Sequence, residues 1–200
     1  IARSLRAMRF IHHSDEERRS RLQWVMSRLA EDPDQWSGIA NAIAQAADLG
    51  IVGLELEEQE VPQEVLELLR RLPWSEDEEA EVPPEVLKEL QRHLVLHHRG
   101  ADGEEYRLTI GQQSQGTLTW LATVGPAMDA LRLGQVLCID ELDASLHPTL
   151  TATLVDMFKD PDLNTRGAQI VFTTHDTALL DNSPVQLLEA GEVWMTEKSP

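Results

Sequence analysis

Three polar side chains follow two apolar runs of this sequence. The run VLCID ends at Asp140 with Glu141 directly after it, and the run QIVFTT leads to His175. Continuous apolar runs of this length are typical of strands that are buried on both faces of a parallel sheet. Ligands of such sheets bind beyond the carboxyl ends of the strands. If the two strands are neighbours, Asp140, Glu141 and His175 meet at one edge of the sheet.

These residue types fit chemistry on a phosphate. A carboxylate at a strand end can hold Mg²⁺, and a second carboxylate beside it can orient and deprotonate an attacking water. A histidine can contact a γ-phosphate. Each signal alone is unspecific, because acidic pairs and Thr-His pairs also occur in ordinary polar loops. Their joint occurrence, with Glu141 and His175 34 residues apart and a helical pattern between them, predicts metal-assisted phosphate chemistry.

A third element lies upstream, in the segment GQQSQGTLTWL. It places Ser114 and Gly116 at the start of a helical pattern that runs from Thr117 to Leu133. The N–H groups and the dipole at such a helix start favour an anion such as a phosphate. The alternative is an ordinary helix cap, in which a hydroxyl caps the helix and the glycine eases the turn. Pro126 within the pattern predicts a kink or a break.

The elements that must position these residues divide the chain in two. Residues 1–92 are expected to be a helical and acidic region, with a helix before Asp32-Pro33, a helix in IANAIAQAADLG and two similar helices that each begin with Val-Pro. Residues 93–200 are expected to be a lobe in which strands alternate with helices. A hairpin across GADG opens this lobe and EVWMTE closes it as the last strand. This order predicts an α/β fold with a parallel sheet.

Composition excludes several classes of protein. A formal net charge of −18 over 200 residues argues against a general nucleic-acid binder or a protein of anionic membranes. The acidic run WSEDEEAE is interpreted as a solvated surface. The single cysteine, Cys138, indicates a reducing compartment, and the sequence has neither a signal peptide nor 18 consecutive apolar residues. We therefore expect a cytoplasmic protein without a membrane partner.

The three elements in this order resemble the C-terminal lobe of an ABC-type ATPase head of the RecF, SMC and OLD branch. SQGT, IDELDASLHP and GAQIVFTTHDTALLD are similar to the AAA-type ATP-binding proteins of bacterial abortive-infection and retron defence systems. The resemblance covers about residues 94–200. It implies the parallel-sheet lobe of a P-loop NTPase with a helical insertion before it.

The resemblance also implies a role for each motif. Asp140 matches the aspartate that is linked to Mg²⁺, Glu141 matches the catalytic glutamate, and His175 matches the switch histidine. The residues implied to bind ATP are Ser114, Gly116 and Thr117 of the signature motif and Asp143 of the loop that crosses a dimer interface. His147 stands where transporters carry an aspartate, which argues against a transporter subunit.

The phosphate-binding loop G-x-x-x-x-G-K-[ST] is absent from the 200 residues, and no lysine lies between Lys88 and Lys159. Either that lobe is encoded before Ile1 or nucleotide binding was lost, and the retained carboxylates favour the first explanation. The resemblance implies head-to-head dimerisation driven by ATP, with the partner subunit completing each site. We expect a homodimer coupled to an effector nuclease or toxin in phage defence or DNA metabolism, with DNA as a possible ligand. The 200 residues alone should hydrolyse ATP poorly or not at all.

Three alternatives remain at this point. Asp140, Glu141 and Asp143 could form the metal site of a nuclease, although no lysine lies close by in the sequence. The acidic helical half could be a non-catalytic module that docks a partner. His93, His97 and His98 could bind zinc if a helix placed two imidazoles on one face.

Overall fold

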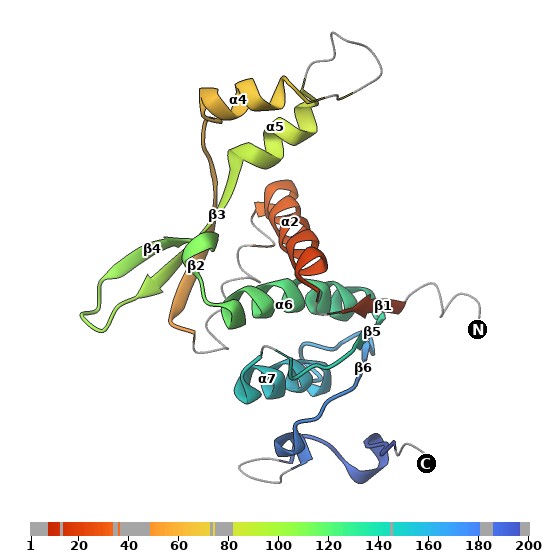
Figure 1. Ribbon diagram of the computed structural model, residues 1–200. Helices are drawn as coiled ribbons and strands as arrows, with labels where there is room; N and C mark the ends of the chain where they lie inside the picture. The colour runs from red at the N-terminus through yellow and green to blue at the C-terminus, as the bar shows by residue number, and fades with distance from the viewer. Residues whose placement is uncertain are drawn as a thin grey trace. The chain divides into compact units, whose positions relative to one another are not determined.

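In the computed structural model the chain forms two compact units, whose helices and strands are shown in Figure 1. The first unit comprises Ile1–Arg21 and Gln115–Pro200, and the second comprises Leu22–Ser114. The structure describes residues 8–12, 14–33, 36, 49–72, 74, 82–144, 146–180 and 186–196.

A parallel three-stranded sheet organises the first unit. Its strands are β1 (Met8–Ile11), β5 (Val136–Ile139) and β6 (Gln169–Phe172), in the order β1-β5-β6. Ile139 is aligned with Ile11 on one side and with Phe172 on the other, so the three strands end level with one another. The predicted neighbourhood of the VLCID and QIVFTT strands is confirmed, and so is the α/β fold class.

Two helices pack with this sheet. The long helix α6 (Gln115–Leu133) precedes β5, and α7 (Pro148–Lys159) connects β5 to β6. Helix α6 continues through Pro126, so the break expected there does not occur. Most of its residues are buried, among them Trp120 with no exposed surface. Burial on this scale outweighs the roughly 3 kcal/mol that an interior proline costs a helix.

The strands of this sheet bury one face more than the other. Leu137 and Ile139 are almost fully buried. On the other face, Phe10 of β1 is 63% exposed, and Val171, at the same level on β6, is 57% exposed. The expectation of strands buried on both faces is therefore met on one face only within the described residues. The prediction that EVWMTE forms the last strand is wrong. Its first residue ends the short 3₁₀ helix η3 (Ala190–Glu192), and residues 193–196 pair with no described strand.

The second unit holds an antiparallel sheet in the order β2-β3-β4. Its strands are β2 (Ile51–Glu58), β3 (Arg92–Arg99) and β4 (Glu105–Thr109), and its helices are α4 (Gln63–Leu69), α5 (Pro84–Gln91), the 3₁₀ helix η1 (Ile110–Gln112) and the part of α2 (Asp15–Glu31) from Leu22 onward. The predicted hairpin across GADG is confirmed, and Gly103 takes a positive φ of 86° in the turn. Both helices that begin after Val-Pro are also confirmed.

The predicted division of the chain needs correction. Residues 1–92 are not uniformly helical, because β1 and β2 lie among them, and the second unit ends at Ser114 rather than at residue 92. Strand β2 was missed because its glutamates belong to the acidic run, although Ile51 and Leu54 turn inward from it. The helix predicted in IANAIAQAADLG falls largely on residues 37–48, outside the described part. No helix among the described residues has the length and apolar character needed to cross a bilayer.

Candidate functional site at the strand ends

The candidate site begins where the backbone pairing of the parallel sheet ends. The N–H of Asp140 donates to the carbonyl of Ile11 at 3.2 Å, and the N–H of Thr173 donates to the carbonyl of Ile139 at 3.1 Å. Asp140 and Thr173 are therefore the first residues beyond β5 and β6. The structure brings the two predicted polar segments together at one edge of the sheet, as parallel strands with level ends require.

Thr173 joins the two segments through its side chain. Its hydroxyl donates to Oδ1 of Asp140 at 2.6 Å and accepts the N–H of Glu141 at 2.8 Å. Its carbonyl accepts the N–H of Leu142 at 2.8 Å. Sequence reasoning missed this residue. Thr173 could have been identified from an alignment of β5 and β6 with level ends, because that alignment places the first residue after each strand side by side.

Glu141 has an unusual backbone. Its φ of 51° is the only positive φ of a non-glycine residue among those described. The left-handed conformation costs an L-residue roughly 1–2 kcal/mol, and it is held here by bonds on both sides. The Glu141 N–H reaches Thr173, its carbonyl accepts the N–H of Ala144 at 2.8 Å, and the following Leu142 is fully buried. The carboxylate itself belongs to an exposed residue. Backbone strain of this kind is common at functional sites.

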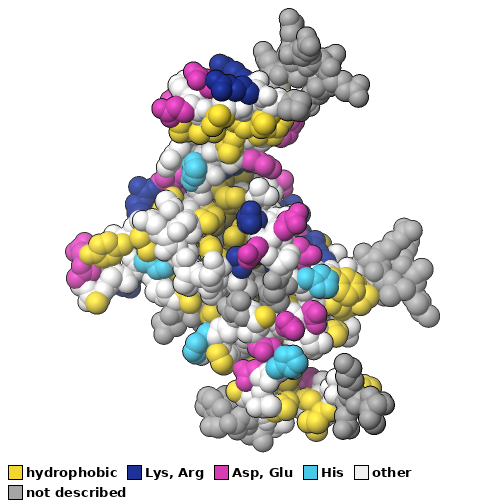
Figure 2. Space-filling model, viewed as in Figure 1, with side chains coloured by type: hydrophobic (Ala, Val, Ile, Leu, Met, Phe, Trp, Pro, Cys, Tyr) yellow, Lys and Arg dark blue, Asp and Glu magenta, His cyan; other side chains and the backbone are white. Residues whose placement is uncertain are grey.

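Asp143 turns toward the loop after β6. Its Oδ1 accepts the backbone N–H of His175 at 3.1 Å. Partial burial acts to raise the pKa of Asp143, but hydrogen bonds from Thr174 and from the His175 N–H outweigh it and hold that pKa below its usual value. Figure 2 shows acidic and histidine side chains close together on the surface in the lower half of the view. Asp143 thus bonds to the segment that carries His175, and its contact with nucleotide stays a prediction.

The signature-like segment lies at the other end of a long helix. After α6, Gly134 takes a positive φ of 66° and the N–H of Gln135 caps the helix on the carbonyl of Ala130 at 2.9 Å, so the chain turns back into β5. Gly116 therefore lies in the first turn of α6, at the opposite end of that helix from β5.

Of the other signature residues, Ser114 is exposed just before α6 and Thr117 is buried, with 7% of its surface exposed. The burial of Thr117 leaves its side chain little access to a ligand.

The residues at the strand ends fit Mg²⁺. Asp140 is exposed, and the one side-chain hydrogen bond that its carboxylate makes to a described residue engages Oδ1. Oxygen donors with room for water are what Mg²⁺ prefers. No cluster of three or more possible metal-binding side chains occurs among the described residues. The three-carboxylate nuclease site of Asp140, Glu141 and Asp143 is therefore not assembled.

The zinc site expected as an alternative is not assembled either. His93, His97 and His98 lie on strand β3, not on a helix. Nε2 of His97 lies 3.0 Å from Oε2 of Glu55, and Nε2 of His98 lies 3.0 Å from Oε1 of Gln113. Adjacent strand residues point to opposite faces, so His97 and His98 cannot share one ion.

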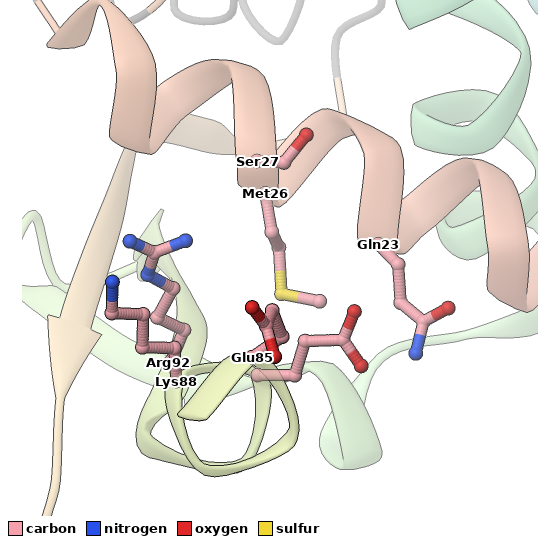
Figure 3. Close-up of a pocket in the computed structure, with 7 residues that line it drawn as sticks. Gln23, Met26, Ser27, Glu85, Lys88 and Arg92 are labelled. Carbon is pink, nitrogen blue, oxygen red and sulfur yellow. The ribbon is translucent and has the colours of Figure 1, made fainter. Parts of the chain in front are cut away.

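A small hollow lies between α2 and α5 in the second unit (Figure 3). Its volume is about 190 Å³, below the roughly 300–1,000 Å³ of small-molecule sites. Figure 3 shows Met26 pointing from α2 toward the acidic and basic side chains of the α5 segment. Seven residues line it: Gln23, Met26, Ser27, Glu85, Lys88, Glu89 and Arg92. Two acidic and two basic side chains around a hollow of this size give no catalytic arrangement.

Comparison with known proteins identifies the family of the chain. A family model described as "AAA domain, putative AbiEii toxin, Type IV TA system" matches residues 4–181. No curated protein and no solved structure gives a significant match. The family match spans both units, whereas the resemblance seen in the sequence covered only about residues 94–200. The chain belongs to this family of AAA domains, which confirms the expected ATPase of the abortive-infection type.

Proposed function

We propose that this chain carries the catalytic carboxylates and the phosphate-sensing histidine of an ATPase that binds ATP with Mg²⁺ and hydrolyses it. Membership of the AAA family supports an ATPase-type function in abortive-infection systems. The observation that carries the proposal is the convergence of Asp140, Glu141 and the His175 segment at the ends of two paired strands.

Each residue has a distinct task in the proposed reaction. Asp140 would hold Mg²⁺, which offsets phosphate charge when it is bound. Glu141 orients a water molecule and takes its proton as the water oxygen bonds to the γ-phosphorus. The bond between that phosphorus and the oxygen of the leaving ADP breaks in the same displacement. His175 contacts the γ-phosphate and responds to its loss.

We propose that a second copy of the chain completes the site. Ser114 and Gly116 stand at the start of the helix that precedes β5, and the resemblance to ABC-type ATPase heads implies that such residues complete the site of a second subunit. Ser114 and Gly116 would therefore face the nucleotide of a partner in a head-to-head dimer. A phosphate-binding loop must also be supplied, because none occurs in the 200 residues. We expect the isolated chain to hydrolyse ATP poorly or not at all.

The cellular setting is part of the same proposal. We propose that the ATPase works in the cytoplasm and that its cycle controls an effector, such as a nuclease or a toxin, in phage defence. A role in DNA metabolism fits the same cycle. The family description supports the defence setting, and the acidic charge of the chain argues against DNA as a general ligand.

The proposal is tested by Glu141→Gln in the complete protein. We expect hydrolysis to fall by a factor of about 10² or more, because a general base is typically worth that much, while ATP binding persists and an ATP-bound dimer accumulates. Turnover by phosphate release and dimerisation by light scattering measure the two effects. Glu58→Gln, at an exposed glutamate of β2, is the matched control and should leave both unchanged. Undiminished turnover in Glu141→Gln would contradict the assignment.

A further inference from the structure

The Thr173 hydroxyl makes two bonds that no apolar side chain could make. It gives its only proton to Oδ1 of Asp140 at 2.6 Å and accepts the N–H of Glu141 at 2.8 Å. The bond to Asp140 has the short length of a hydrogen bond to an ionised carboxylate. One hydroxyl therefore fixes the side chain of the proposed metal ligand and the backbone of the proposed catalytic base.

We propose that Thr173 is a positioning residue for ATP hydrolysis, which acts by fixing the Asp140 carboxylate and the left-handed backbone of Glu141. The inference rests on the proposed function for its consequence in catalysis, but the contacts themselves do not depend on it. Thr173 acts through Asp140 and Glu141 and has no assigned contact with substrate.

The left-handed Glu141 backbone gives this hydroxyl its importance. A φ of 51° is unfavourable for glutamate, so the conformation persists only where neighbouring contacts hold it. The Glu141 N–H donates to a side chain here, not to another backbone group. Removing that acceptor lets Glu141 relax toward an ordinary conformation, and the direction of its carboxylate changes with the backbone.

The surrounding contacts predict that removal of the hydroxyl leaves the fold intact. Thr173 is an exposed residue, and its backbone keeps the bonds to Ile139 and Leu142 whatever its side chain. Asp143 and the N–H of His175 form a second connection between the same two loops. Loss of the Thr173 hydroxyl should therefore disturb only Asp140 and Glu141.

The test compares Thr173→Val, which keeps the shape and loses the hydroxyl, with Thr173→Ser, which keeps the hydroxyl. In the complete protein we expect Thr173→Val to lower kcat by about 10- to 100-fold, the usual cost of losing a partner that orients a catalytic group or a metal ligand. The KM for ATP should change by less than about threefold, since ATP itself is not contacted. Thr173→Ser should stay within about threefold of the wild type in both values. Thr165→Val, at an exposed threonine in the turn before β6, is the control.

A second readout does not need ATP. In the 200-residue chain, the solvent exchange of the Glu141 amide proton, followed by NMR, should speed up at least about tenfold in Thr173→Val and not in Thr173→Ser. An unchanged exchange rate in the valine variant, or a serine variant as slow in turnover as the valine one, overturns the inference. If the wild-type complete protein hydrolyses no ATP, the proposed function fails, and the exchange measurement still decides whether Thr173 holds Glu141.

Discussion

The ends of β5 and β6 and the antiparallel sheet of the second unit both carry many charged residues, but they use them differently. At the ends of β5 and β6, side chains bond to backbone groups of the opposite loop, as Thr173 does with Glu141 and Asp143 with His175. On the antiparallel sheet, side chains pair with one another across strands, as Glu55 of β2 does with His97 of the neighbouring β3 and with Arg107 of β4.

The kind of partner that a charged or polar side chain bonds to distinguishes the candidate site from an ordinary charged surface. A bond from a side chain to a backbone N–H fixes where the loop lies, and a fixed loop can aim a catalytic group. An exposed ion pair between two flexible side chains fixes little and stabilises little. Helices α4 and α5 of the second unit bury no residue at all, and Leu68 is 61% exposed. This difference supports the proposal that catalysis belongs to the first unit, although the second unit carries much of the charge.

The largest stability difference between the units should come from their ion pairs. Asp129 in α6 has a fully buried side chain and accepts from Arg9 at 2.7 Å and from Arg132 at 2.9 Å. Asp129→Asn should lower the free energy of unfolding by about 2–3 kcal/mol, somewhat less than for a fully buried pair because both arginines reach solvent. Glu57→Gln, which removes an ion pair with the exposed Arg107, should cost at most about 1 kcal/mol. Urea unfolding measures both values, and equal costs would contradict the distinction.

The fold was predictable where the chain pattern is simple. Two apolar runs and the helical pattern between them predicted β5, α7 and β6, because a short uninterrupted apolar run is typical of a buried strand. Strand β1 was not predicted, since four residues with an arginine among them carry almost no pattern. The structure explains that arginine: Arg9 is a partner of the buried Asp129. Such a pairing joins residues 120 apart in the sequence and leaves no local signal.

The candidate site was predictable in its members and not in its connections. The places of Asp140, Glu141 and His175 followed from the strands that precede them, whereas the hydrogen bond from the His175 N–H to Asp143 was not foreseen. The positive φ of Glu141 could not be foreseen, because glutamate has no preference for it and the surrounding bonds impose it. Side-chain patterns predict which faces are buried, but not the loop conformations that hydrogen bonds between distant residues select.

A glycine substitution should have opposite effects on stability in the two regions. Glycine adopts a positive φ freely, so Glu141→Gly relieves the strain of that residue and should raise the free energy of unfolding by about 0.5 kcal/mol after the extra chain entropy of glycine is deducted. Glu58→Gly, in strand β2, should lower it by about 0.5–1 kcal/mol. The same Glu141→Gly should abolish hydrolysis because the carboxylate is gone. Paired urea titrations check the signs, and destabilisation by Glu141→Gly would show that its backbone is not strained.

The smallest expected effect on the free energy of unfolding concerns two aspartates, one in each unit, whose pKa values lie below the ordinary value for aspartate. For Asp102 the cause is first the Tyr106 hydroxyl, at 2.6 Å, and then the N–H of Glu104. For Asp143, burial opposes the shift, and hydrogen bonds from Thr174 and His175 prevail. In both cases the folded state binds a proton less readily than the unfolded state does. Each carboxylate therefore adds stability that is complete above the unfolded-state pKa of about 4 and is lost as the pH falls through the lower folded-state pKa.

Asp102→Asn and Asp143→Asn should thus each lower stability slightly at neutral pH, and the difference from the wild type should shrink below about pH 4. Unfolding curves at a series of pH values measure this common effect. Only Asp143→Asn should also slow ATP hydrolysis in the complete protein, because its carboxylate holds the backbone of His175, whereas Asp102 holds only the tip of a hairpin. Equal effects of the two variants on hydrolysis would mean that the Asp143 bond does not position His175, and the distinction between a loop fixed for catalysis and a loop fixed for stability would fail at this residue.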